Sequence, residues 1–414
     1  MAELREVVAV DAVRIPTGKA GWGGFKKGAL SDISSQVLIV SAIEALVDRV
    51  KKNAPNFNPI EIEDVAVGCC SQIGEQSGNL GKMAAIGAGL PDDVAGWTID
   101  RYCNSGLQAI TAQCHAIMCG HADVMIAGGV ESMSRYAMGS TMDAAAKAGL
   151  PCEFHPKVME RGMVIMGVSA EMVAEKYNLT REDMDWFGIR SHQRAIAAQR
   201  DEEAYKKRVI PINIAKQGEE PKWFEKDESP RAQCLDDPEA AYTNVQKLEP
   251  RFKAVADGGK VTAANSSGIV DGAAAVMLME RNKAEKLGLK PMVRVVATAV
   301  ASSDPLYMLL GPVPAMQKIF KRSGLTMADM GVFEANEAFA SPVMAFCIEQ
   351  GIAFDDPRIN PTGGAIAMGH PVGCSGALYF CEMVHHMVNK NIRYGLETLC
   401  GGGGVANAII VEKV

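Results

Sequence analysis

An approximate internal repeat is the feature that most constrains the fold of this chain. Three short motifs occur in its first part and recur, in the same order, near its end. The matching pairs are 62–68 with 327–333, 103–107 with 373–377, and 127–129 with 400–402. Identity within each pair is low, but the offsets between partners all fall between 265 and 273 residues. The shared order and spacing predict two similar halves.

Apolar periodicity predicts that strands and helices alternate in the first half. The segment 293–297, at the start of the second half, resembles the first strand of the first half. The predicted elements are strands at 7–13, 62–68, 122–128 and 293–297, and helices at 30–50 and 103–119. The order strand, helix, strand, helix, strand is typical of an α/β fold with a largely parallel sheet covered by helices.

Two domains are expected, because 414 residues exceed what one hydrophobic core usually serves. We place them at residues 1–285 and 286–414. The stretch from about 130 to 250 matches neither half, and it holds a helical segment (181–200) and a polar, proline-bearing loop (217–240). A long insertion of this kind is more often a lid or binding loop than core, so we expect an inserted lid or loop region in the first domain.

Charge and hydropathy argue against two classes of partner. With 42 basic and 49 acidic residues the net charge is −7, so the chain lacks the basic surplus typical of nucleic-acid binding. The longest apolar runs have strand length or are interrupted by glycine, so no membrane partner is expected. No signal or transit peptide precedes the first apolar segment, which predicts a cytoplasmic protein whose eleven cysteines are reduced.

Four potential metal ligands, Cys114, His115, Cys119 and His121, lie close together in the sequence. Adjacent helix positions point about 100° apart, so Cys114 and His115 cannot readily share an ion. No second cysteine pair completes a tetrahedral set. We therefore predict no metal site.

Three residues point to covalent acyl chemistry on sulfur. Cys103 opens a predicted helix of small residues, where unpaired N–H groups favour the thiolate. His370 lies in a glycine-rich turn and can take a proton near neutral pH. Cys400 precedes four glycines whose N–H groups can form an oxyanion hole. Taken alone, each residue is more often structural, and the glycine run is more often a tight turn.

Two further segments are candidates for the same site. Asn336 follows a strand and can orient a water or donate to an oxyanion, although such a residue is otherwise a helix cap. The small-residue stretch 263–275 fits a turn whose hydroxyls can contact an amide-rich ligand arm.

Together these segments resemble the thiolase family of acetyl-CoA acetyltransferases and 3-ketoacyl-CoA thiolases. The resemblance covers nearly the whole chain and is carried by ordered motifs. They are 14–18 (Arg-Ile-Pro-Thr-Gly), 128–134 (Gly-Gly-Val-Glu-Ser-Met-Ser), 166–171 (Met-Gly-Val-Ser-Ala-Glu), 311–315 (Gly-Pro-Val-Pro-Ala) and the final glycine loop. It implies two βαβαβαββ halves in a five-layered αβαβα arrangement. It also implies a homodimer or homotetramer, in some relatives with a separate partner subunit.

The resemblance further implies roles for the candidate residues. Thiolases cleave a 3-ketoacyl-CoA with CoA as substrate and use no other cofactor. Cys103 would carry the acyl group as a thioester, with His370 as its base and Cys400 as the second acid and base. Asn336 would hold a water in one oxyanion hole, and the backbone N–H groups of Cys103 and Gly402 would form the other. Such covalent transfer predicts ping-pong kinetics.

The resemblance also implies a substrate-binding set. Ser267 matches a serine that contacts the pantetheine arm, and Met166 and Phe339 match residues lining the acyl site. Two positions depart from the family: Asp100 replaces a frequent Asn, and Ile165 stands where short-chain biosynthetic relatives often carry His. The motifs are closer to the degradative group of fatty acid β-oxidation, so a longer, branched or aromatic acyl group is expected.

Three alternatives remain at this stage. An acetyl-CoA acetyltransferase would use the same residues in the condensing direction. A decarboxylative ketoacyl synthase usually has a histidine where Cys400 stands. A non-catalytic acyl-CoA-binding subunit would be expected to have lost Cys103 or His370, and both are present.

Overall fold

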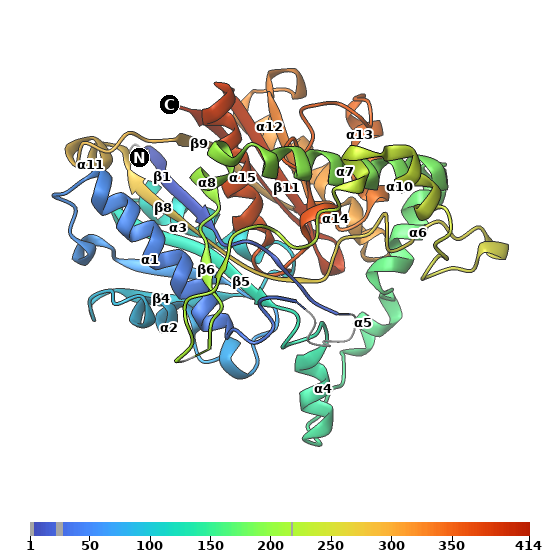
Figure 1. The fold of residues 1–414 in the computed structure, drawn as a ribbon, viewed down its shortest axis with the longest axis horizontal. Helices are drawn as coiled ribbons and strands as arrows, with labels where there is room; N and C mark the ends of the chain where they lie inside the picture. Colours follow the sequence, from blue (N-terminus) through green and yellow to red (C-terminus); the bar gives the residue numbers. More distant parts are fainter. Residues whose placement is uncertain (1–3, 22–27, 217) are drawn as a thin grey trace.

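The computed structural model describes residues 4–21, 28–216 and 218–414 (Figure 1). The strands of the first half are β1 (Val7–Arg14), β2 (Gly18–Lys19), β3 (Asp64–Gly68), β4 (Ala95–Ile99), β5 (Val124–Ser132) and β8 (Val270–Glu280). Those of the second half are β9 (Val293–Ser302), β10 (Val332–Ala335), β11 (Tyr394–Cys400) and β12 (Val405–Lys413). All of them join one sheet in the order β10-β11-β12-β9-β1-β8-β5-β3-β4, with β2 paired to β8.

The helices also occur in matching sets. The first half has α1 (Ser35–Asn53), α2 (Leu80–Gly87) and α3 (Ser105–Met118), followed after β8 by the short α11 (Arg281–Lys286). The second half has α12 (Pro312–Ser323), α13 (Ala340–Gln350), the short α14 (Ala365–Met368) and α15 (Ser375–Lys390). Three helices of each half therefore match in order, α1 with α12, α2 with α13 and α3 with α15, whereas α11 and α14 have no counterpart among the described elements.

The predicted duplication is confirmed by the order of the strands. The first half runs β4-β3-β5-β8-β1 across the sheet, and the second runs β10-β11-β12-β9 in the equivalent places. The counterpart of β4 is reduced to a single bridge between Phe333 and Ile359. The halves join where β1 pairs with β9 at Ala9 and Val293.

The prediction of a largely parallel sheet is wrong. Among the described strands, only the pairs β3–β4, β3–β5 and β10–β11 are parallel, and every other pair along the sheet is antiparallel. The error has a physical cause. A strand buried on both faces, such as β5 or β8, is a continuous apolar run whichever way its neighbour points.

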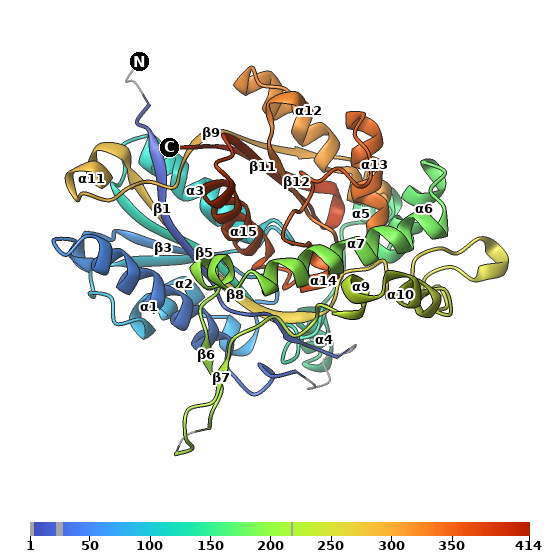
Figure 2. The same ribbon diagram turned by 45° about the horizontal axis from the view of Figure 1, so that its top comes forward.

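Five layers follow from three separate groups of buried side chains. One group packs α1 and α2 against the outer face of the first half's strands. A second places α3 and α15 between the inner faces of the two halves. A third packs α12 and α13 on the outer face of the second half. Figures 1 and 2 show the central pair between the two halves of the sheet, and the predicted αβαβα arrangement is confirmed.

The first helix begins later than predicted. Residues 30–50 were expected to be helical, but α1 begins at Ser35 because the Ser34 side chain accepts the backbone N–H of Val37 and caps the first turn. The sequence patterns did not predict α2, β4 or β8 in the first half. The turn predicted at 263–275 is partly wrong, because β8 begins at Val270. Strand β4 is short and has an edge position, and none of its residues is fully buried.

The regular structure in the insertion between β5 and β8 is mainly helical. It contains α4 (Ser140–Lys147), α5 (Pro156–Arg161), α6 (Met166–Lys176), α7 (Arg181–Arg200), α8 (Glu202–Arg208), β6 (Ile212–Asn213), β7 (Trp223–Phe224), α9 (Gln233–Asp236) and α10 (Pro238–Val245). The helix predicted at 181–200 is confirmed. Residue 217, the first of the loop predicted at 217–240, lies outside the described residues. The prediction is partly wrong, because α9 and the first residues of α10 fall within this range. Pro238 occupies the first position of α10, where a helix tolerates proline.

The four sulfur and imidazole groups near the end of α3 do not converge. Cys114 is buried in the central layer, Cys119 is exposed, and His115 Nε2 lies 2.8 Å from Thr298 Oγ1. Within the described ranges no three His, Cys, Asp or Glu side chains are grouped to hold a metal ion. None of the described helices is long and apolar enough to cross a membrane.

Candidate active site

The two central helices begin side by side. Gly376, the second residue of α15, lies so close to α3 that a Cβ on it would be 2.3 Å from the Leu107 backbone nitrogen. Gly106, the second residue of α3, is equally confined by α15. Glycine permits this approach because it has no side chain. Cys103 and His370, which precede the two helices, therefore lie at the same end of the central layer.

Cys103 is buried in a strained turn between β4 and α3. Tyr102 has φ +50°, a left-handed conformation that bulky residues rarely adopt, and Asp100 Oδ1 accepts its backbone N–H at 2.7 Å. Asp100, which replaces the Asn frequent in the family, thus accepts a backbone hydrogen bond that holds this turn. Burial raises the pKa of Cys103 well above its usual range, and the nearby Cys400 thiol adds to the rise. Burial therefore outweighs the expected helix-terminal stabilisation of the thiolate.

The glycine loop after β11 contacts the turn that precedes α3. A Cβ on Gly402 would lie 3.2 Å from Cγ of Tyr102, and one on Gly401 would lie 2.6 Å from Nδ2 of Asn104. Asn104 Oδ1 also accepts the backbone N–H of Asn407 in β12 at 2.8 Å. These contacts bring the two predicted thiols, from opposite halves of the chain, into one site.

Asn336 follows β10 and faces the second thiol, Cys400. Its backbone N–H donates to the carbonyl of Thr398 in β11 at 3.1 Å. Burial raises the pKa of Cys400 to about 12, and the Asn336 amide offsets part of that rise. Both amide atoms of Asn336 are buried and make no hydrogen bond of ordinary geometry within the described chain. A hollow of about 10 Å³, close to the room one water needs, borders Asn336 and Cys400.

His370 is buried and neutral at pH 7, because burial lowers its pKa to about 4. Its Nδ1 lies 2.6 Å from Ser375 Oγ, and its Nε2 has no hydrogen-bond partner among the described residues. The backbone N–H of His370 donates to the Gly268 carbonyl at 2.8 Å. A neutral imidazole with a free nitrogen can accept a proton, which agrees with the predicted chemistry.

Two of the predicted substrate-binding residues, Ser267 and Phe339, lie on segments that contact each other near the His370 turn. The backbone N–H of Ser267 donates to the carbonyl of Ala338 at 3.0 Å, which places Ser267 beside Phe339. The Phe339 ring packs edge-on against Phe252, with 6.1 Å between ring centroids. Met166 begins α6 and packs against the same group of buried residues. Segments far apart in the sequence thus supply one apolar surface.

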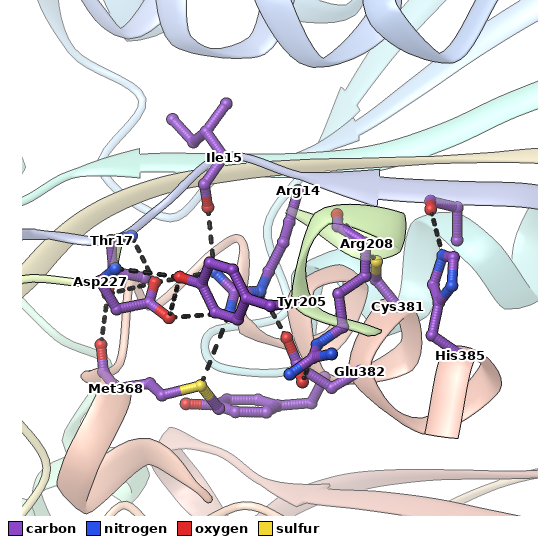
Figure 3. Close-up of polar contacts among 12 residues, drawn as sticks. Arg14, Ile15, Thr17, Tyr205, Arg208, Asp227, Met368, Cys381, Glu382 and His385 are labelled. Atoms are coloured by element: carbon purple, nitrogen blue, oxygen red, sulfur yellow. Dashed lines mark hydrogen bonds and ion pairs between the residues drawn. The ribbon is translucent and has the colours of Figure 1, made fainter. Parts of the chain in front are cut away.

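Sequence reasoning missed a buried ion network beneath the His370 turn (Figure 3). Arg14 Nη1 and Nη2 bind the two oxygens of Asp227 at 2.7 and 2.8 Å, and its Nε binds Glu382 Oε1 at 2.6 Å. The Tyr205 hydroxyl donates to Asp227, and Arg208 pairs with the other oxygen of Glu382. Burial alone would raise the pKa of Glu382, but the two arginines lower it to about 2.

This network reaches the histidine turn through Thr17. The Thr17 hydroxyl lies 3.1 Å from Oδ1 of Asp227, the same oxygen that binds Arg14. It also lies 2.6 Å from the carbonyl oxygen of Met368, two residues before His370. The Tyr379 hydroxyl donates to the Gly369 carbonyl at 2.7 Å. The turn is therefore held from below by polar groups. The sequence signals were the position of Arg14 at the end of the apolar strand β1 and its place in the motif 14–18.

A second missed residue ties the two halves together. Glu131, buried in β5, accepts backbone N–H groups from Cys70 at 2.9 Å, Ser71 at 3.0 Å and Gly373 at 2.9 Å. Gly373 belongs to the segment between His370 and α15, whereas the other donors follow β3. A carboxylate inside a strand that is otherwise small and apolar was the available signal.

Comparison with known proteins gives the site its context. The model of the thiolase N-terminal domain matches residues 7–282, and that of the thiolase C-terminal domain matches 289–413. The chain is 37% identical over 418 residues to a steroid 3-ketoacyl-CoA thiolase of Mycobacterium tuberculosis, covering 100% of this chain and 95% of that protein. It is 37% identical over 421 residues to the 3-oxoadipyl-CoA/3-oxo-5,6-dehydrosuberyl-CoA thiolase of Escherichia coli, covering 99% and 100%.

A solved structure agrees with these matches. The crystal structure of the Bacillus anthracis acetyl-CoA acetyltransferase superposes with a TM-score of 0.85, at 33% identity, and covers 100% of both chains. The fold, with its duplicated halves around two central helices, and the family models define the class: the chain belongs to the thiolase family. Within that family it is an acyltransferase of the 3-ketoacyl-CoA thiolase type, which uses CoA as a substrate for thiolytic cleavage.

Proposed function

We propose that Cys103 is the nucleophile that carries the acyl group during 3-ketoacyl-CoA cleavage. The observation that carries this proposal is that two buried thiols lie together beside the start of α3, while the buried His370 precedes α15, which begins next to α3. The Cys400 thiol lies close enough to raise the pKa of Cys103, and a neutral His370 offers an Nε2 without a hydrogen-bond partner among the described residues. Cys103 is a protonated thiol at rest and therefore needs a base.

The proposed acylation half-reaction moves two protons and one acyl group. His370 Nε2 takes the proton of the Cys103 thiol, and the sulfur attacks the 3-keto carbon of the substrate. The bond between that carbon and C2 then breaks and leaves the enolate of acetyl-CoA. Cys400 gives its proton to this enolate, and acetyl-CoA leaves. The Cys400 thiolate then takes the proton of the CoA thiol, and the CoA sulfur attacks the thioester carbonyl on Cys103. The Cys103 sulfur leaves and regains its proton from His370, which releases the shortened acyl-CoA and restores all three groups for the next ping-pong cycle.

Two donor sets serve the two charges that develop in this reaction. Asn336, whose amide atoms are unpartnered beside a hollow of the size of one water, is proposed to stabilise one oxyanion through that water. The backbone N–H groups of Cys103 and Gly402 are proposed to hold the other. The close contact of the Gly402 loop with the Cys103 turn supports this pairing.

Ser267 is proposed to contact the pantetheine arm, and Met166 and Phe339 to line the acyl site. Two of the relatives named above are thiolases for steroid and 3-oxoadipyl acyl groups. With Ile165 largely exposed at the start of α6, they support an acyl group larger than acetoacetyl in the degradative direction. The same residues serve condensation, and the structural likeness to an acetyl-CoA acetyltransferase supports that reverse reaction as the second candidate.

Several broader expectations belong to this proposal. The enzyme is proposed to need no cofactor beyond its CoA substrates, to form a homodimer or homotetramer, and to work in the cytoplasm. A partner subunit remains an option of the family. The division at residues 1–285 and 286–414 is supported by the family models, which leave residues 283–288 between them.

A panel of 3-ketoacyl-CoA substrates, from acetoacetyl-CoA to long-chain and aryl forms, tests the proposal. We expect CoA-dependent cleavage of some members by the intact enzyme and none by Cys103→Ala. Cys119→Ala, which alters an exposed thiol at the far end of α3, should cleave normally. Normal turnover by folded Cys103→Ala would overturn the nucleophile assignment.

A further inference from the structure

The first residue of α15, Ser375, is buried against the candidate base. Its hydroxyl oxygen lies 2.6 Å from Nδ1 of His370 and 3.0 Å from the carbonyl oxygen of Pro371. Ser375 is 0% exposed and His370 is 6% exposed. The contact therefore lies in a low-dielectric environment, where the direction of each hydrogen bond has large energetic consequences.

The hydrogen atoms can be assigned from the partners on each side. The Ser375 hydroxyl has one hydrogen, and the Pro371 carbonyl can only accept it. With that hydrogen directed to Pro371, the hydroxyl oxygen accepts a hydrogen from Nδ1 of His370. In the opposite arrangement Nε2 would carry a hydrogen, and that buried N–H would have no acceptor among the described residues. Buried N–H groups without a partner are rare in native proteins.

We propose that Ser375 is a positioning residue that fixes His370 in the tautomer with hydrogen on Nδ1 and a free lone pair on Nε2. This inference rests on the proposed role of His370 as a base, and it identifies the residue that sets the tautomer of His370 before the reaction. When the Cys103 proton moves, the S–H bond breaks and an Nε2–H bond forms. The Nδ1 hydrogen stays where it is, and Ser375 accepts it before and after the transfer.

The internal repeat gives independent support for a positioning role. Ser105 is the counterpart of Ser375 in the first half and is the first residue of α3. Its hydroxyl donates to the Tyr102 carbonyl at 2.6 Å and accepts the Arg101 backbone N–H at 2.8 Å. Each central helix therefore begins with a buried serine that ties down the turn bearing a proposed catalytic group.

The direct test is the tautomer of His370 in the intact enzyme. Nitrogen-15 NMR of histidine-labelled protein, with the His370 signal assigned by its loss in His370→Gln, distinguishes a protonated Nδ1 from a protonated Nε2. We expect the Nδ1–H form in the wild type and a mixture in Ser375→Ala. An Nε2–H form in the wild type would overturn the proposal. This readout does not depend on activity, so a failure of the proposed thiolase reaction would leave it interpretable.

Kinetics supply the second readout. A positioned general base contributes a large factor, so Ser375→Ala should lower kcat by roughly 10- to 100-fold, and Ser375→Thr should regain most of it. The control is Ser341→Ala, which removes a buried hydroxyl that donates to the Ala170 carbonyl from the first turn of α13. Unchanged kcat in Ser375→Ala would contradict the proposal. Equal losses of kcat in Ser375→Ala and Ser341→Ala, at matched thermal stability, would also contradict it.

Discussion

At the scale of single residues, the site depends on burial more than on the helix terminus. The sequence favoured a thiolate at Cys103 because the residue lies before α3. In the fold the thiol is buried, and burial together with Cys400 keeps its pKa well above the usual range. The pKa of His370 is lowered to about 4 by the same cause. Both shifts therefore favour an uncharged thiol and an uncharged imidazole in the resting site.

A pH profile of thiol alkylation tests this neutral resting state. Because the folded pKa of Cys103 is raised, the thiolate fraction should keep rising with pH through and beyond the usual range of a thiol. We expect the rate of Cys103 alkylation by iodoacetamide, measured by peptide mass spectrometry, to increase about tenfold per pH unit from 7 to 9, the slope for a group below its pKa. Exposed Cys119 serves as the internal control.

A plateau in the Cys103 rate that begins near pH 6 would contradict this account. It would show a thiolate paired with a histidine cation in the resting enzyme. The opposite sign of the two shifts is the reason for our expectation: a raised thiol pKa and a lowered histidine pKa both favour the uncharged pair.

At the scale of elements, the contact between α3 and α15 sets the position of the site. Replacement of Gly376 by Ala would place a Cβ 2.3 Å from the backbone of Leu107, which cannot move aside alone. Overpacking of this kind should destabilise the protein by about 1–3 kcal/mol. Urea unfolding measures the effect, and the helices should separate enough to lower activity as well. A variant with unchanged stability and activity would show that the helices are not tightly packed there.

The elements also show how far sequence patterns reach. Apolar runs located β1, β3 and β5, and the repeat located their counterparts in the second half. They could not give strand direction, because strands buried on both faces lack alternation. Pro238 was taken as part of a loop although it begins α10, and the short edge strand β4 was too exposed to produce an apolar run.

At the scale of the whole molecule, Arg14 joins three parts of the chain. It lies in β1, Asp227 lies in the insertion, and Glu382 lies in α15 of the second half. All three side chains are fully or almost fully buried. The ion pairs therefore hold the insertion against the body of the enzyme, beneath the turn that carries His370.

Loss of this arginine should be severe. Arg14→Met leaves the Asp227 carboxylate buried without its main partner, and removal of one member of a buried pair typically destabilises by about 3–5 kcal/mol. Arg281→Ala breaks two partly exposed ion pairs, with Glu6 and Glu285, and should change stability by no more than about 2 kcal/mol, since each such pair contributes about 0–1 kcal/mol. Calorimetry compares the two. Equal small effects would show that the buried network does not stabilise the fold.

Site residues that stand in a local sequence pattern could be predicted, whereas those that depend on distant partners could not. Cys103, His370 and Cys400 stand in glycine-rich contexts that a linear pattern displays, and Asn336 follows a recognisable strand. Arg14 binds Asp227, which is 213 residues away in the sequence, and Glu131 binds Gly373, which is 242 residues away. Their contacts could therefore be identified only from the fold. Ser375 was part of the repeat, but its contact with His370 depends on how the turn closes.

Trapping the acyl-enzyme tests the central claim most directly. The enzyme is mixed with a cleavable 3-ketoacyl-CoA and limiting CoA, quenched in acid and digested for mass spectrometry. The account predicts an acyl group on the peptide containing Cys103, absent from the Cys400 peptide and removed when CoA is added. An acyl group on another residue, or complete single-turnover cleavage with Cys103 unmodified at every time point, would contradict it.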